Sequence, residues 1–188
     1  FILSSILISP SLYREFFALR IHGNVLANIT LSPHNKINII FSNLIVSIIE
    51  SVIISVIIGF IYLYVTKVVF NLLNIFFLLV CLIIFLFLIG NLFITIFLIL
   101  DTLSIVLLSL GIIYLYIIFG NGFIIETSFF PYGISVFLEK IPSALVFKQF
   151  QTFNSIGIIN FQIFLILLPI IYFWILGNAY LLKSKMSQ

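Results

Sequence analysis

The sequence predicts an all-α integral membrane protein of about five transmembrane helices, and composition and patterning together lead to this class. The 188 residues are 64% hydrophobic and only 7% charged, and the mean hydropathy is +1.42. Soluble domains carry about 25% charged residues. The apolar stretches are continuous and lack the alternation that a transmembrane barrel requires. Helices are therefore expected, because only helices and closed barrels satisfy the backbone in hydrocarbon.

The uncharged stretches give the expected spans, since a spanning helix needs roughly 20 apolar residues. The first is expected at Ser11 to Leu31, after Pro10 and before Pro33, because proline cannot continue a helix interior. The remaining spans are expected, in order, at Asn38 to Thr66, between Lys67 and Asp101, at Thr102 to Ile125, and at Asn160 to Leu182.

The stretch "ETSFFPYGISVFLEKIPSALVFKQF", residues 126 to 150, differs from the spans in its two prolines, its glycine and its four charged residues. It predicts an interfacial or re-entrant helix. The chain then divides into residues 1–66, a long tilted helical hairpin formed by the first two spans, and residues 67–188, additional membrane helices whose role the sequence does not indicate.

Several classes of site are not expected. A net charge of +3 is too small to indicate a nucleic-acid partner, and a lone Cys81 excludes a disulfide framework and a cysteine-rich metal site. No cofactor or metal is expected. Asparagines in apolar surroundings predict helix packing or interfacial positions: Asn71, Asn74, Asn91 and Asn178. Charged residues near span ends are expected at the interface: Arg14, Glu15, Asp101, Glu126, Glu139, Lys140 and Lys148.

Arg20 is the exception, because it lies near the middle of the first expected span. An arginine costs several kcal/mol there and stays protonated. Such a residue usually marks an ion path, a proton relay or a gating element. The alternative is that its long side chain reaches the membrane interface while the stem packs in lipid.

Glu50 is the one charged residue of the second expected span. The turn "SPHN" predicts that the first two spans form an antiparallel hairpin. With the turn centred between Pro33 and His34, Arg20 and Glu50 differ in depth by roughly 4–5 Å, at a rise of about 1.5 Å per residue. An acid opposite a base at this depth fits either a proton route or a purely structural ion pair.

The stretch "LRIHGNVLAN", residues 19 to 28, resembles the signature helix of ATP synthase subunit a, in which L-R-L-F-G-N-x-x-A-G carries an indispensable arginine. The residues that match are Leu19, Arg20, Gly23, Asn24 and Ala27. The second span resembles the last helix of that family, with Glu50 in place of the usual glutamine. Asn28 departs from the family pattern, and the resemblance covers about residues 10 to 66.

This resemblance implies a proton-translocating stator subunit of an F-type ATP synthase, with the c-ring, other membrane-sector subunits and lipids as partners in a large hetero-oligomeric complex. The expected location is the mitochondrial inner membrane, or otherwise a bacterial or organellar energy-transducing membrane. Arg20 would face the c-ring carboxylate, lower its pKa and block a direct proton leak. Gly23 and Ala27 would pack at the c-ring. The proton path would include Glu50, Asn24, Asn28, His22 and His34. Other roles remain open: a packed His22, a solvated His34, and a Glu50 that only pairs with Arg20.

Two other functions remain open. The permease subunit of an ABC-type exporter has L-L-x-S-P before its second span and F-F-P before re-entrant helices. "ITLSP" (Ile29 to Pro33) and "SFFP" (Ser128 to Pro131) occupy similar places here, and the exporter accounts better for the downstream segments. The other is an accessory structural subunit of a mitochondrial membrane complex, in which Arg20 would meet lipid headgroups.

Overall fold

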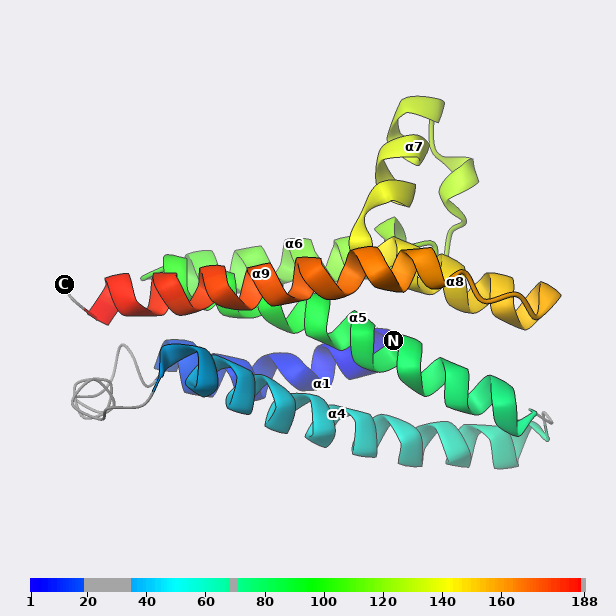
Figure 1. Ribbon diagram of the computed structural model, residues 1–188, viewed down its shortest axis with the longest axis horizontal. Coiled ribbons are helices and arrows are strands. Elements are labelled where there is room, and N and C mark those ends of the chain that lie inside the picture. The colour runs from blue at the N-terminus through cyan, green and yellow to red at the C-terminus, as the bar shows by residue number, and fades with distance from the viewer. Residues whose placement is uncertain (19–34, 68–70, 187–188) are drawn as a thin grey trace.

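Regular structure in the computed structural model is helical throughout the residues that it describes, which are 1–18, 35–67 and 71–186. The long helices run side by side, and a short helix stands away from them (Figure 1). The elements are, in order, α1 (Ile2–Tyr13), η1 (Arg14–Ala18), α4 (Lys36–Thr66), α5 (Leu72–Ile99), α6 (Leu103–Leu115), η2 (Tyr116–Gly120), η3 (Thr127–Phe129), α7 (Tyr132–Lys140), α8 (Pro142–Ile156) and α9 (Phe161–Met186).

Within the described residues, 4 helices are long and apolar enough to cross a membrane. They are α4, α5, the continuous helix Leu103–Gly120 formed by α6 and η2, and α9 up to Lys185. These correspond to the last four of the expected spans, so a helical membrane protein is confirmed. The first expected span is described only up to Ala18, and its remaining residues lie outside the described part.

The first helix does not begin after Pro10, as the sequence predicts, but runs through it from Ile2. Proline has no N–H for the carbonyl of residue i−4, which here is Ile6. The Ser9 hydroxyl donates to that carbonyl oxygen at 3.2 Å and so satisfies it. After Pro10 the helix widens into the π-helical turn η1. A neighbouring hydroxyl therefore allows the helix to continue where a proline alone predicts an end.

Helices α1 and α4 pack antiparallel through serines. The Ser4 hydroxyl donates to the Ser55 hydroxyl at 2.7 Å, and the Ser11 and Ser47 hydroxyls lie 2.9 Å apart. Small residues allow helices to approach closely in a membrane, and their hydroxyls hydrogen-bond across the interface. The expected antiparallel arrangement is present in the described parts of both helices.

The register of this pair differs from the one that the turn predicts. A turn centred between Pro33 and His34 would place Glu50 level with Phe17. The serine contacts place it level with Ser9, which is about 12 Å further along α1 at a rise of about 1.5 Å per residue. The positions of the serines along both helices set this register, and the length of the turn does not. Arg20 lies outside the described residues.

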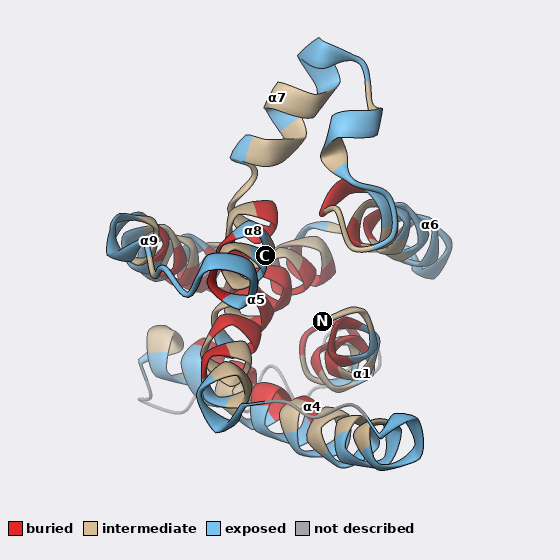
Figure 2. Cartoon of the chain, turned by 90° about the vertical axis from the view of Figure 1, so that its right-hand side faces the viewer, coloured by how far each residue is buried: buried red, intermediate tan, exposed pale blue. Residues whose placement is uncertain are grey.

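Helix α5 forms the centre of the bundle. It contacts α1, α4, α8 and α9, and much of its length is buried (Figure 2). At Gly90 the three helices α1, α4 and α5 meet, because a Cβ atom added there would lie 3.1 Å from Leu44 Cδ1 and 3.3 Å from Ile8 Cδ1. The absence of a side chain at Gly90 allows this close approach.

The segment that the sequence predicts to be interfacial or re-entrant forms two short helices. With 9 and 15 residues, α7 and α8 are both shorter than a membrane span requires. Helix α7 buries none of its residues and projects from the bundle across the direction of the long helices (Figure 1). Helix α8 returns along α5, where the rings of Phe77 and Phe153 lie 4.2 Å apart.

Candidate functional site

Most of the residues that the sequence singles out for function lie outside the described part of the chain. These are Arg20, His22, Gly23, Asn24, Ala27, Asn28 and His34. Their roles at a proton path or a c-ring stay predictions. Glu50 is described, and the site is therefore built from Glu50 and from the polar groups that the fold brings together elsewhere.

Glu50 lies at the middle of α4, which is 31 residues long. At a rise of about 1.5 Å per residue it is about 21 Å from Lys36 and about 24 Å from Thr66. It is exposed, on an otherwise apolar face that includes Val46, Ile49 and Ile53. Its carboxylate has no hydrogen-bond or ion-pair partner among the described residues. A carboxylate at the middle of a spanning helix is costly in hydrocarbon, so Glu50 is a candidate functional residue.

A second polar group joins α5 to α9 inside the bundle. Both Asn91 and Asn178 are buried, and the Asn178 amide donates to the Asn91 carbonyl oxygen at 3.1 Å and to its Oδ1 at 3.0 Å. The Thr95 hydroxyl lies 2.7 Å from Asn178 Oδ1 and accepts from Trp174 Nε1 at 2.9 Å. Each polar group has a partner, so this network holds two helices together and leaves no free group for a ligand.

The other asparagines named above lie at helix ends. Asn71 caps α5, because its side chain accepts from the Leu73 N–H at 3.4 Å. Asn74 donates to Asn154 of α8 at 3.2 Å. The expected packing between helices is present for Asn91, Asn178 and Asn74, and the interfacial position of Asn71 stays a prediction.

A third polar group lies where η2 ends. The Asn121 Oδ1 atom accepts from the Tyr116 hydroxyl at 3.0 Å and from the Ser143 hydroxyl at 2.7 Å, and the Asn121 amide donates to the Ile117 carbonyl oxygen at 3.3 Å. Asn121 and Ser143 are buried. These bonds fix the start of α8 against the end of the third span, which positions the segment between them.

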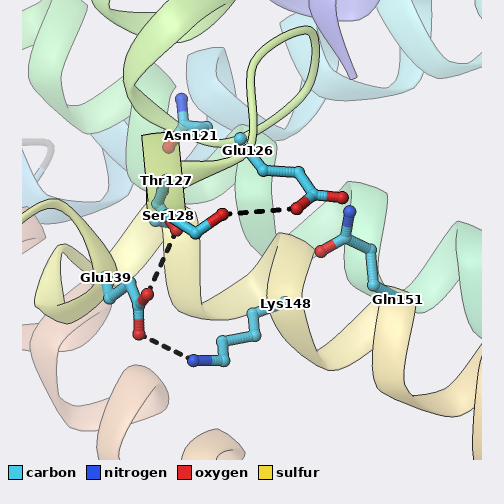
Figure 3. Close-up of a pocket in the computed structure, with 9 residues that line it drawn as sticks. Asn121, Glu126, Thr127, Ser128, Glu139, Lys148 and Gln151 are labelled. Carbon is cyan, nitrogen blue, oxygen red and sulfur yellow. Dashed lines mark hydrogen bonds and ion pairs between the residues drawn. The ribbon is translucent and has the colours of Figure 1, made fainter. Parts of the chain in front are cut away.

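That segment and α8 line an open polar cavity of about 380 Å³ (Figure 3). Residues from the loop, α7 and α8 line it: Asn121, Gly122, Glu126, Thr127, Ser128, Glu139, Ala144, Lys148 and Gln151. Lys148 Nζ donates to Glu139 Oε2 at 2.8 Å, the Thr127 hydroxyl donates to Glu139 Oε1 at 3.2 Å, and the Ser128 hydroxyl donates to Glu126 at 3.3 Å. The cavity is open, and its charges are largely internally paired.

The ion pair between Glu139 and Lys148 connects α7 to α8. Hydrogen bonding and attraction from Lys148, with a hydrogen bond from Thr127, hold the pKa of the Glu139 carboxyl below its usual range. The stabilisation from this ion pair is therefore fully present above the ordinary pKa of a carboxyl group. It is lost as the pH falls through the lowered pKa of Glu139 in the folded protein. Both side chains are partly exposed, so the contribution to stability is small.

The sequence did not predict this cavity. Its charged residues were expected only at the interface, and nothing in their spacing indicated a common site. A proline between two short helices was the available signal, because α8 begins at Pro142, where the chain bends, and Glu139 and Lys148 meet across this bend. Among the described residues, no group of three or more histidine, cysteine, aspartate or glutamate side chains could hold a metal ion.

Four apolar helices of spanning length, with polar contacts between them, define a multi-pass helical membrane protein. Comparison of the chain with models of known protein families, with curated proteins and with solved structures finds no match in any of the three.

Proposed function

We propose that this chain is the permease subunit of an ABC-type exporter, the membrane part through which a substrate passes. The observation that carries the proposal is the segment between the third described span and α9. Ser128 to Pro131, the "SFFP" stretch, lies immediately before α7. The chain leaves the bundle before α7, runs back toward the bundle in α7 and continues along α5 in α8. Exporter permeases have this order of a span, F-F-P, re-entrant helices and a last span.

The start of α4 is the second feature that supports the proposal. In exporter permeases a short segment ending in Ser-Pro precedes the second span and contacts a cytosolic ATPase. Here "ITLSP" comes directly before α4, although Ile29 to Pro33 lie outside the described residues. The ATPase would bind at Ile29 to Lys36, at the bundle end where Asp101 pairs with Lys185 at 3.1 Å. This chain would supply the passage and no nucleotide chemistry.

The test places a photo-crosslinking amino acid at Lys36 and, as a control, at Lys67 at the other end of α4. Expressed in its native membrane, the protein is expected to crosslink from position 36 to a neighbour that binds and hydrolyses ATP. Position 67 is expected to give no such product, because a helix crossing the bilayer separates the two sites. Crosslinks from position 36 to proteins that do not bind ATP would contradict the proposal.

A second candidate remains the proton-translocating subunit of an F-type ATP synthase, in the mitochondrial inner membrane. The exposed carboxylate of Glu50 at mid-helix favours it, because a helix that faces a c-ring needs polar groups at that depth. Arg20→Ala distinguishes this candidate from the exporter. Loss of ATP-driven proton pumping in an assembled complex is expected if Arg20 faces a c-ring, and retained pumping excludes the candidate.

A further inference from the structure

The polar cavity beside α7 lies where the third described span ends. That span, Leu103–Gly120, has 18 residues, and at a rise of about 1.5 Å per residue it is about 27 Å long, close to the roughly 30 Å of the hydrocarbon core. Asp101 and Lys185 pair just before its start. Asn121 follows its end and lines the cavity. The cavity therefore lies at the level of the lipid headgroups on the other side of the membrane.

The Glu126 carboxylate is the charge of this cavity that the fold leaves without an opposite charge. It accepts a hydrogen bond from the Ser128 hydroxyl at 3.3 Å, and the ion pairs of the described residues do not include it. The Gln151 amide also lines the cavity, and it and the Glu126 carboxylate point toward one another (Figure 3). A carboxylate and an amide oxygen placed in this way can both accept from a primary ammonium group, which has three donors.

Lys148 supplies a positive charge in the same cavity. It points toward Glu139 and away from Glu126 (Figure 3), and its ammonium donates to Glu139 at 2.8 Å. A lysine ammonium has three donors, and this side chain is 58% exposed, so further donors are accessible to a phosphate group. The cavity thus presents an acceptor for a cation and a donor for an anion, which is the charge pattern that a zwitterion requires.

Exposed apolar side chains lie next to the polar lining. Phe129, which follows Ser128, is 79% exposed, and Ile134 and Phe137 of α7 are 50% and 67% exposed. Helix α7 runs across the direction of the long helices, so it lies along the membrane plane when these helices cross the bilayer (Figure 1). Interfacial helices in this orientation bury apolar side chains about 5–10 Å into the boundary between headgroups and acyl chains. A ligand in the cavity would therefore have acyl chains beside it, which favours a lipid over a soluble molecule.

We propose that this cavity binds the phosphoethanolamine headgroup of a bilayer lipid. The ammonium group of the lipid donates to Glu126 and Gln151, its phosphate accepts from Lys148, and its acyl chains lie along Phe129 and the apolar side of α7. The volume of about 380 Å³ is in the range of small-molecule sites, about 300–1,000 Å³. A phosphocholine headgroup has the same charges, but its quaternary ammonium has no N–H to donate. The inference is independent of the proposed function.

Competition between lipids tests the ligand. The protein is placed in nanodiscs that contain phosphatidylethanolamine and phosphatidylcholine in equal amounts with identical acyl chains, and the lipid retained after detergent extraction is counted by native mass spectrometry. Phosphatidylethanolamine is expected in roughly tenfold excess, because a hydrogen bond to a charged group contributes about 1.5–3 kcal/mol. Equal retention of the two lipids, or stronger retention of phosphatidylglycerol in a third mixture, would overturn the proposal. Binding of soluble phosphoethanolamine without any preference between the lipids would assign the site to a soluble ligand and would also overturn it.

Variants of the lining test the assigned contacts. Glu126→Gln is expected to abolish the preference for phosphatidylethanolamine, because an amide has no charge to attract the ammonium group. Lys148→Gln is expected to lower the retention of both lipids, since both carry the phosphate. Lys140→Gln is the matched control, because Lys140 is an exposed lysine of the same segment that does not line the cavity. An unchanged preference in Glu126→Gln, or equal losses in Lys148→Gln and Lys140→Gln, would contradict the proposal. The ATPase crosslink from Lys36 is scored separately, so the two proposals fail independently.

Discussion

At the scale of single residues, the most informative side chain in the core is Asn178. It is buried, it donates to two oxygens of Asn91, and it lies 2.7 Å from the Thr95 hydroxyl. Asn178→Leu would remove these bonds and leave the partners unsatisfied between α5 and α9. We expect the free energy of unfolding in mixed micelles to fall by roughly 1–2 kcal/mol.

The control for Asn178→Leu is Asn154→Leu, which removes an exposed hydrogen bond to Asn74. An exposed substitution is expected to change stability by no more than about 0.5 kcal/mol. Trp174 is the chain's one tryptophan and donates to Thr95, so its emission spectrum reports on the network directly. A stable Asn178→Leu variant with unchanged Trp174 emission would show that the network does not hold the two helices together.

At the scale of the elements, the crossing at Gly90 determines how closely α1 and α4 approach α5. Gly90→Leu would place a branched side chain where a Cβ alone lies 3.1 Å from Leu44 and 3.3 Å from Ile8. Overpacking of this kind costs about 1–3 kcal/mol or more. Gly111→Leu is the matched control, because nothing lies within 4 Å of a Cβ added at Gly111 of α6. Equal unfolding midpoints for the two variants would contradict the close approach.

The elements also show what the sequence alone could predict. Four spans were predicted nearly to their ends, because charged residues at Lys67 and Asp101 and long apolar runs mark these ends directly. The predicted start of the first helix was wrong. The effect of Pro10 depends on whether a neighbouring group donates a hydrogen bond to the Ile6 carbonyl oxygen, as the Ser9 hydroxyl does. The register of α1 on α4 was wrong for a similar reason, since it depends on serine contacts between helices.

The candidate site was less predictable than the spans. The sequence identified Glu50 from its charge in an apolar run, which is a local signal. Glu50 is exposed because α1, α5 and α9 pack against other faces of α4. The faces that these helices cover are a property of the whole bundle and cannot be read from the sequence around Glu50. The cavity beside Glu139 likewise depends on the bend between α7 and α8, which brings residues of both helices together.

At the scale of the whole molecule, side-chain contacts fix which helix ends share a face of the membrane. Lys185 pairs with Asp101 at 3.1 Å, so the end of α9 lies beside the start of α6. Asn74 pairs with Asn154 at 3.2 Å, so the start of α5 lies beside the end of α8. Because α5 connects these two places across the bundle, they should lie on opposite sides of the bilayer.

Cysteine labelling with an impermeant maleimide tests this arrangement in a Cys81→Ala background. Lys36→Cys and Lys185→Cys are expected to react from one side of sealed vesicles, and Lys67→Cys and Ser155→Cys from the other, because each pair lies at one end of the bundle (Figure 1). Vesicles of inverted orientation should exchange the two sets. If Lys36→Cys and Lys67→Cys react from the same side, α4 does not cross the bilayer. The depth assigned to Glu50 at the middle of α4 would then not hold either.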